Sequence, residues 1–103
     1  AGQLLDAGAT AVVCTSDSLA LGAASRWRAA GLRTDAVIGF DDTPQAAGGS
    51  PALTTIRQPL EEMGRQALQM LLTYIEDPER PFEYRELPTE LVVRDSCRPL
   101  IAG

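Results

Sequence analysis

The chain has 103 residues, of which 45% are hydrophobic and 22% charged, values typical of one globular domain. Its formal net charge is −5, and its nine basic residues, all arginines, are scattered along the sequence, so no basic stripe indicates a nucleic-acid surface. The sequence contains no histidine, which argues against a zinc site and excludes a histidine-based catalytic triad within the chain. No apolar run approaches the length of a membrane span, and we expect no membrane partner.

The two cysteines and the first residues say little about catalysis. Cys14 and Cys97 are too far apart in the sequence to indicate a disulfide framework, and Cys14 lies in an apolar run typical of a buried free thiol. The chain begins without Met or a signal-peptide pattern. Residues 3–8 resemble the last turn of a helix closed by Gly8, and we therefore expect a truncated start.

The first half of the chain predicts a strand, a helix and a second strand. Residues 11–15 form a short apolar run that fits a strand covered on both faces. A helix then extends to about residue 30, where Gly31 ends it. Its apolar stripe consists of Ala20, Ala23, Ala24, Trp27 and Ala30. Residues 36–40 form the next strand.

The second half continues the same alternation. Residues 45–51 form a loop with room for one helical turn, and residues 53–58 form a strand. A helix over residues 59–76 carries a long apolar stripe. Residues 82–87 and 90–94 are extended.

We expect the tail, residues 95–103, to be frayed. The order strand, helix, strand, loop, strand, helix, strand predicts an α/β fold with a three-layer, mostly parallel sheet.

Polar residues follow three of the predicted strands. Ligands of open α/β sheets bind beyond the carboxyl ends of the strands, where carboxylate and amide groups can orient a polyhydroxylated molecule. An aromatic side chain at the same edge can supply an apolar face for a sugar ring or a base. The candidate ligand-binding residues are Ser16, Asp17, Phe40, Asp41 and Gln58.

Simpler explanations exist for the same residues. Ser16 and Asp17 are suitable caps for the following helix, and Asp41 and Asp42 can cap a turn before Pro44. Neighbouring residues on a strand point to opposite faces, so the two adjacent carboxylates are a weak signal for acid–base catalysis. We expect no enzymatic activity. A glycosidase that uses Asp41 with another acid is the alternative from a different class.

Four segments, in this order, resemble regulators of the LacI/GalR family. They are Thr-Ser-Asp-Ser-Leu-Ala-Leu-Gly-Ala at 15–23, Ile-Gly-Phe-Asp-Asp-Thr-Pro at 38–44, Leu-Thr-Thr-Ile-Arg-Gln-Pro at 53–59 and Leu-Pro-Thr-Glu-Leu-Val-Val-Arg-Asp-Ser at 87–96. The resemblance covers nearly the whole chain. Each motif alone is weak, whereas the ordered set is specific.

This resemblance implies a two-lobed core similar to type I periplasmic binding proteins. Residues 1–103 would be the C-terminal portion of an effector-binding and dimerisation domain, without the DNA-binding headpiece and most of the first lobe. The implied partners are a small effector (a sugar or purine-like metabolite), a second copy of the chain, and operator DNA through the headpiece only. The implied location is cytoplasmic, with no cofactor and no metal. The C-terminal lobe of a periplasmic sugar-binding transport protein is the alternative.

The resemblance also suggests individual roles. Ser16 occupies a position where the family often has a ligand-contacting Asn, and Asp17 would stabilise the helix start. Asp41 matches the acid that bonds ligand hydroxyls or ring nitrogens, Phe40 the adjoining aromatic position, and Gln58 a crossover residue near the cleft.

Regions that usually form the family's dimer contact match Leu21 and Ser25 on one helix, together with Gln45 and Pro51. By the same analogy, the helix over residues 59–76 would pack in the missing lobe. Its apolar stripe would otherwise be exposed, which favours self-association.

Overall fold

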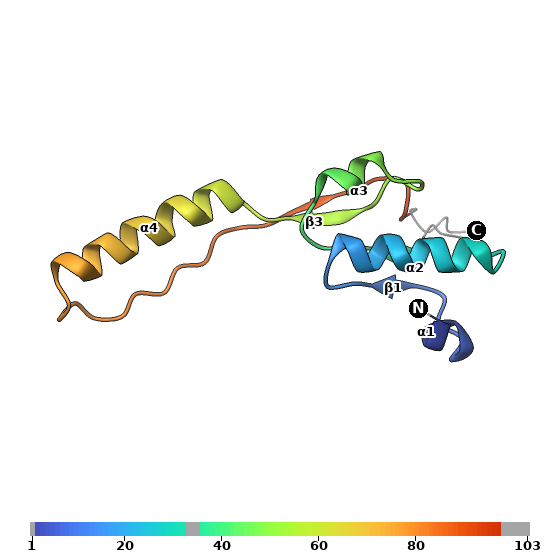
Figure 1. The fold of residues 1–103 in the computed structure, drawn as a ribbon, viewed down its shortest axis with the longest axis horizontal. Coiled ribbons are helices and arrows are strands. Elements are labelled where there is room, and N and C mark those ends of the chain that lie inside the picture. Colours follow the sequence, from blue (N-terminus) through green and yellow to red (C-terminus); the bar gives the residue numbers. More distant parts are fainter. Residues whose placement is uncertain (1, 33–35, 98–103) are drawn as a thin grey trace, which may run out of the picture. The chain divides into compact units, whose positions relative to one another are not determined.

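The computed structural model describes residues 2–32 and 36–97, which divide into two compact units (Figure 1). Unit 1 consists of the chain up to Arg57 together with the part from Glu90 onward, and unit 2 consists of residues 58–89. The described strands and the buried core lie in unit 1, and the longest helix lies in unit 2.

The order of elements follows the predicted alternation, with shorter strands. The elements are α1 (Gly2–Asp6), β1 (Val12–Val13), α2 (Asp17–Ala29), β2 (Val37–Ile38), α3 (Pro44–Gly48), β3 (Thr55–Arg57), α4 (Leu60–Glu76) and β4 (Glu90–Val92). The helical turn allowed for in the loop over residues 45–51 is present as α3. Residues 82–87 belong to no helix or strand of the structure.

The strands run mostly in parallel, as the sequence predicts. β1 pairs with β2 in parallel, and single parallel bridges, Ile38 with Thr54 and Asp41 with Arg57, continue the pairing toward β3. β4 pairs with β3 in the antiparallel sense. The carboxyl ends of β1, β2 and β3 therefore share one edge of the sheet, which we call the carboxyl edge.

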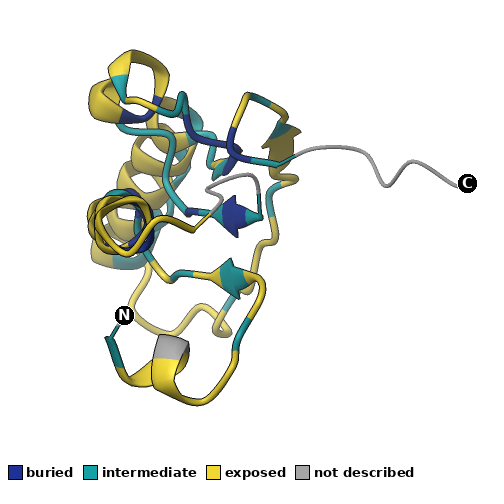
Figure 2. Ribbon diagram, turned by 90° about the vertical axis from the view of Figure 1, so that its right-hand side faces the viewer, coloured by how far each residue is buried: buried dark blue, intermediate teal, exposed yellow. Residues whose placement is uncertain are grey.

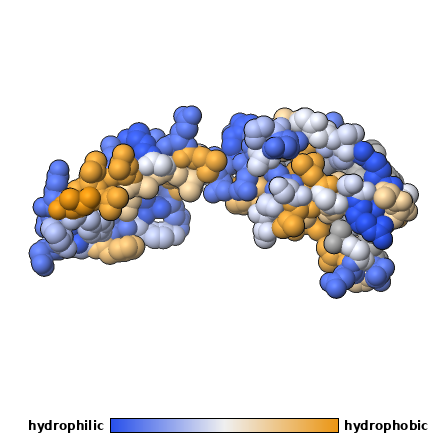
Figure 3. All heavy atoms as spheres, in the orientation of Figure 1, coloured by the Kyte–Doolittle hydropathy of each residue, from blue (hydrophilic) through white to orange (hydrophobic). Residues whose placement is uncertain are grey.

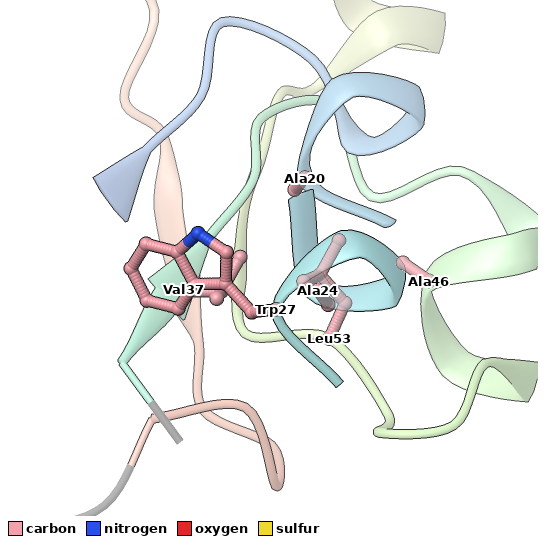
Figure 4. Close-up of a cluster of buried hydrophobic side chains, with 6 residues drawn as sticks. All are labelled: Ala20, Ala24, Trp27, Val37, Ala46 and Leu53. Atoms are coloured by element: carbon pink, nitrogen blue, oxygen red, sulfur yellow. The ribbon is translucent and has the colours of Figure 1, made fainter. Parts of the chain in front are cut away.

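The core lies between α2 and the strands (Figure 4). Trp27 is 2% exposed and lies against Val37. Ala46 and Leu53, from the segments after β2, belong to the same buried cluster. The predicted stripe of α2 is confirmed at Ala20, Ala23, Ala24 and Trp27, and it is wrong at Ala30, which is exposed at the helix end.

Two predictions of burial near the start of the sheet are wrong. Val13 is 77% exposed, so among the described residues one face of β1 is not covered (Figure 2). Cys14 is half-buried rather than buried, and its partial burial raises the pKa of the thiol. Both misses have one cause, since an apolar run does not reveal which face of a strand is covered.

Residues 95–97, at the start of the tail, pack against the strands where fraying was expected. Ser96 is fully buried; its hydroxyl donates to the Val37 carbonyl at 2.6 Å and accepts from the Thr54 amide at 2.8 Å. This side chain joins β2 to the segment before β3. Residues 98–103 of the predicted frayed tail lie outside the described residues.

Helix α4 has no buried residue. Its apolar stripe appears as an exposed orange band in Figure 3, and the exposed large side chains are Leu60, Met63, Leu68, Leu71, Leu72 and Ile75. The chain turns back after the helix, where the Tyr74 hydroxyl donates to the Pro81 carbonyl at 2.7 Å and accepts from the Glu83 amide at 2.6 Å. Among the described residues, no helix has the length and apolar character needed to cross a membrane.

Gly39 lets the end of β2 approach the start of α2. A Cβ atom at this position would overlap the Asp17 carboxylate and would lie 2.8 Å from Leu53 Cδ2. The amide of Gly39 donates to the Thr54 carbonyl at 2.9 Å, so the backbone cannot easily withdraw. The sequence pattern Gly-Phe-Asp-Asp therefore begins with glycine for reasons of space.

We predict that Gly39→Ala lowers the free energy of unfolding by about 1–3 kcal/mol, the usual cost of overpacking. Gly22→Ala is the matched control, because Gly22 lies inside α2 with nothing within 4 Å of its added Cβ. This control should stabilise the fold by about 0.5–1 kcal/mol. Urea denaturation of the two variants measures both effects, and equal stability would contradict the tight approach.

Candidate functional site

The carboxyl edge brings together the start of α2 and the turn after β2, residues 39–43. The Asp17 amide donates to the Phe40 carbonyl at 2.9 Å, and the Asp41 amide donates to the Ile56 carbonyl at 3.0 Å. The turn is therefore held on one side by α2 and on the other by β3. Ser16 is the N-cap of α2, and its hydroxyl accepts from the Leu19 amide at 3.2 Å.

Asp17 holds this edge together. Its carboxylate is fully buried and accepts hydrogen bonds from the Thr43 amide at 2.6 Å, the Thr43 hydroxyl at 3.2 Å and the Thr55 hydroxyl at 2.6 Å. The first two donors lie after β2, and the third lies in β3. One carboxylate thus connects α2 to both neighbouring segments.

The turn itself has an unusual backbone. Asp41 and Asp42 both have positive φ, at 114° and 57°. Asp tolerates the left-handed region better than most residues, yet such conformations cost about 1–3 kcal/mol each and persist only where the surroundings impose them. The hydrogen bonds from Asp17 and β3 provide that constraint.

Two arginines complete the constraint through Asp42. Arg57 Nε donates to Asp42 Oδ2 at 2.7 Å, and Arg94 Nη2 lies 2.8 Å from Asp42 Oδ1. The Asp42 side chain is 11% exposed, and the hydrogen bond from Arg57, together with Arg94, holds the pKa of this carboxyl below its ordinary value against the effect of desolvation. Arg94 also donates to the Leu53 carbonyl at 2.9 Å.

The predicted ligand-binding residues fall into two groups. Ser16, Phe40 and Asp41 are half-buried at the carboxyl edge, and Asp17 lies buried beneath them. Gln58 belongs to unit 2. There it lines a cavity of about 260 Å³ between α4 and the returning chain, together with Pro59, Met63, Gln66, Ala67, Met70, Arg85, Leu87 and Thr89.

The predicted dimer residues gather in unit 1. A Cβ on Gly49 would lie 2.9 Å from Leu21 Cδ2 and 3.1 Å from the carbonyls of Gln45 and Pro51. Leu21, Gln45 and Pro51 therefore all lie close to Gly49. Ser25 lies one helical turn beyond Leu21 and is exposed.

Sequence reasoning missed four residues that shape the site: Thr43, Thr55, Arg57 and Arg94. All lie within or beside the recognised motifs, but their roles depend on pairings between distant segments. One sequence signal could have identified Arg57. It lies near the end of a predicted strand, and the carboxylates Asp41 and Asp42 directly follow the preceding predicted strand. In residues 2–32 and 36–97, no cluster of three or more His, Cys, Asp or Glu could hold a metal ion.

Residues 2–97 match the family described as periplasmic binding protein-like domain. The chain belongs to this family. It is 43% identical over 94 residues to the transcriptional repressor PurR of Vibrio vulnificus, covering 88% of this chain and 28% of that protein. The chain thus spans less than a third of the length of this curated relative.

This chain is also similar to two solved structures of transcription regulators. A LacI family regulator from Enterococcus faecium with bound ribose has 35% identity and a TM-score of 0.80, over 96% of this chain and 38% of that one. The lac repressor dimer bound to operator and the anti-inducer ONPF has 33% identity and a TM-score of 0.80, over 92% and 35%. These matches confirm the resemblance to LacI/GalR regulators.

We predict that Asp17→Asn lowers the free energy of unfolding by about 1.5–3 kcal/mol, because an amide would turn a donor toward Thr43 or Thr55 and remove a charged acceptor. Asp6→Asn, at an exposed position in α1, is the control. Denaturation curves of both variants test this role. A variant as stable as the parent would show that the buried carboxylate does not hold the edge.

Proposed function

We propose that this chain is the C-terminal portion of the effector-binding and dimerisation domain of a LacI-type transcriptional regulator. This function is supported by the family match and by the similarity to the repressor PurR and to two regulators of known structure. These similarities favour it over the alternative, the C-terminal lobe of a periplasmic sugar-binding transport protein. In this proposal the protein is cytoplasmic and not an enzyme. It contacts operator DNA through a separate headpiece, in keeping with the net charge of −5 of this region.

The effector in this proposal is a small polar molecule, a sugar or a purine-like metabolite. The observation that carries it is the constrained turn at the carboxyl edge, where Asp41 and Phe40 lie beside the capped start of α2. A carboxylate accepts hydrogen bonds from hydroxyl or ring N–H groups, and an aromatic ring covers an apolar face. The similarity to a regulator with bound ribose supports the same chemistry.

We assign different roles to the five candidate residues. Ser16, Phe40 and Asp41 would contact the effector at the carboxyl edge. Gln58, the first residue of unit 2, would be a further effector contact. Asp17 is fully buried with partners inside the fold, so we propose that it positions the turn rather than touching the effector.

The test is a thermal-shift screen of the full-length protein with ribose, glucose, maltose, cellobiose, hypoxanthine and guanine. A bound compound raises the unfolding temperature by mass action. We expect one of them to do so, and Asp41→Asn to weaken its affinity by about 10- to 100-fold, the effect of losing a charged hydrogen bond. Asp77→Asn, exposed in unit 2, should bind as the parent does. Equal affinity of Asp41→Asn and the parent would contradict the assignment.

We also propose a homodimer formed by the surface of Leu21, Ser25, Gln45 and Pro51. Ser25 and Gln45 are exposed, and Leu21 and Pro51 are half-buried beside them. The surface therefore combines apolar and polar side chains, as interfaces usually do. The structural relative bound to operator is described as a dimer.

A charge introduced on this surface should break the dimer. We expect Ser25→Arg to raise the dimer dissociation constant by at least about tenfold, because two copies would oppose each other across a symmetric contact. Glu79→Arg, exposed in unit 2, should leave it unchanged. Sedimentation velocity over a dilution series of the full-length protein measures this, and dimers of equal strength would contradict the proposed surface.

A further inference from the structure

Both connections between the two units start from one residue pair. β3 and β4 are antiparallel, and Arg57 pairs with Glu90 at the last position of the ladder. The chain enters unit 2 directly after Arg57 and returns to unit 1 at Glu90. Any rearrangement of the units must therefore change backbone angles next to this pair, as hinge segments at the ends of elements do.

Arg57 also contacts the turn that carries the proposed effector site. Its Nε donates to Asp42 Oδ2 at 2.7 Å, while its Nη1 lies 3.5 Å from Glu90 Oε2. The Asp41–Arg57 backbone bridge brings the same two segments together. The guanidinium of Arg57 in β3 thus contacts both Asp42, the residue after Asp41, and Glu90 in β4.

The two arginines on Asp42 differ in a way that separates their roles. The Arg94 side chain is 18% exposed and donates to the Leu53 carbonyl, so it anchors the turn to the body of unit 1. The Arg57 side chain is 50% exposed, and its second partner, Glu90, is 69% exposed. Ion pairs exposed on both sides contribute little to folding stability, so the second contact of Arg57, with Glu90, calls for another explanation.

We propose that Arg57 is a positioning residue that couples the effector turn to the crossover between the units. The inference rests on the proposed function and adds a route by which an effector at Asp41 is felt at the connections. An effector shifts a conformational equilibrium only through contacts that differ between the two states. Displacement of the Asp42 carboxylate on binding supplies such a difference, because Arg57 then either stays with Glu90 and loses Asp42 or follows Asp42 and loses Glu90.

The test uses the full-length protein and the compound that gives the largest thermal shift among the six sugars and bases named above. Calorimetry gives its dissociation constant, and hydrogen–deuterium exchange gives the protection it confers on peptides covering residues 56–60 and 87–92. The variants are Arg57→Gln, Arg57→Lys and Arg94→Gln. Arg65→Gln is the matched control, since it removes an exposed arginine that pairs with Glu62 inside α4.

We expect Arg57→Gln to weaken binding less than Arg94→Gln does and, at saturating compound, to lower the compound-dependent protection at the crossover by about three- to tenfold. Arg57→Lys should give an intermediate loss, because lysine keeps the charge but lacks the two separate nitrogens with which the guanidinium contacts the two carboxylates. Arg94→Gln should weaken binding itself, and Arg65→Gln should behave as the parent.

Three results would overturn the coupling. Arg57→Gln with the protection of the parent would show that the residue transmits nothing. Arg57→Gln with binding weakened as much as in Arg94→Gln would show that it only holds the site. A parent that binds the compound without protection at the crossover would refute the coupling and leave the proposed function intact, whereas a parent that binds no compound would refute both.

Discussion

The buried carboxylate of Asp17 is the interaction on which the carboxyl edge depends. Removing a charged group from water is costly unless hydrogen bonds replace the lost hydration, and here Thr43 and Thr55 supply three of them. Because the donors come from two other segments, the carboxylate is satisfied only when α2, the turn and β3 are assembled. The interaction therefore favours a single arrangement of three segments that are distant in sequence.

That arrangement stabilises a backbone that local preferences would reject. Consecutive positive φ angles at Asp41 and Asp42 need support from outside the turn. Gly39 supplies the space and Asp17 the acceptors, while Arg94 and Arg57 fix the Asp42 side chain. A turn held from several sides presents its groups in one orientation, which reduces the entropy lost when a ligand binds. The contacts that support the positive φ angles are therefore the same ones that would orient the proposed effector site.

The sequence predicted the order of elements, the parallel character of the sheet and the stripe of α2 because these follow from local periodicity. It also identified the capping position of Ser16 and the unpaired stripe of α4. It failed where the outcome depends on what lies across the sheet: Val13 is exposed, and Ser96 is buried by bonds to β2 and the segment before β3. The roles of Asp17 and Arg57 escaped for the same reason, since their partners are 15 to 38 residues away.

The two units obtain their order from different sources. Unit 1 has a buried core around Trp27 and a network of cross-strand bonds. In unit 2, α4 has 17 residues and no buried side chain, and a helix of this length is marginal in water without packing along its apolar face. Polar contacts of Glu62, Gln66 and Tyr74 hold the helix, but they do not cover its apolar stripe. The carboxyl edge therefore does not rely on α4 for its geometry, while unit 2 needs a surface over the stripe to be equally stable. This asymmetry is consistent with the proposed sensor role, because a firmly held effector turn joined to a unit that needs further packing would let small contact energies shift a conformational equilibrium.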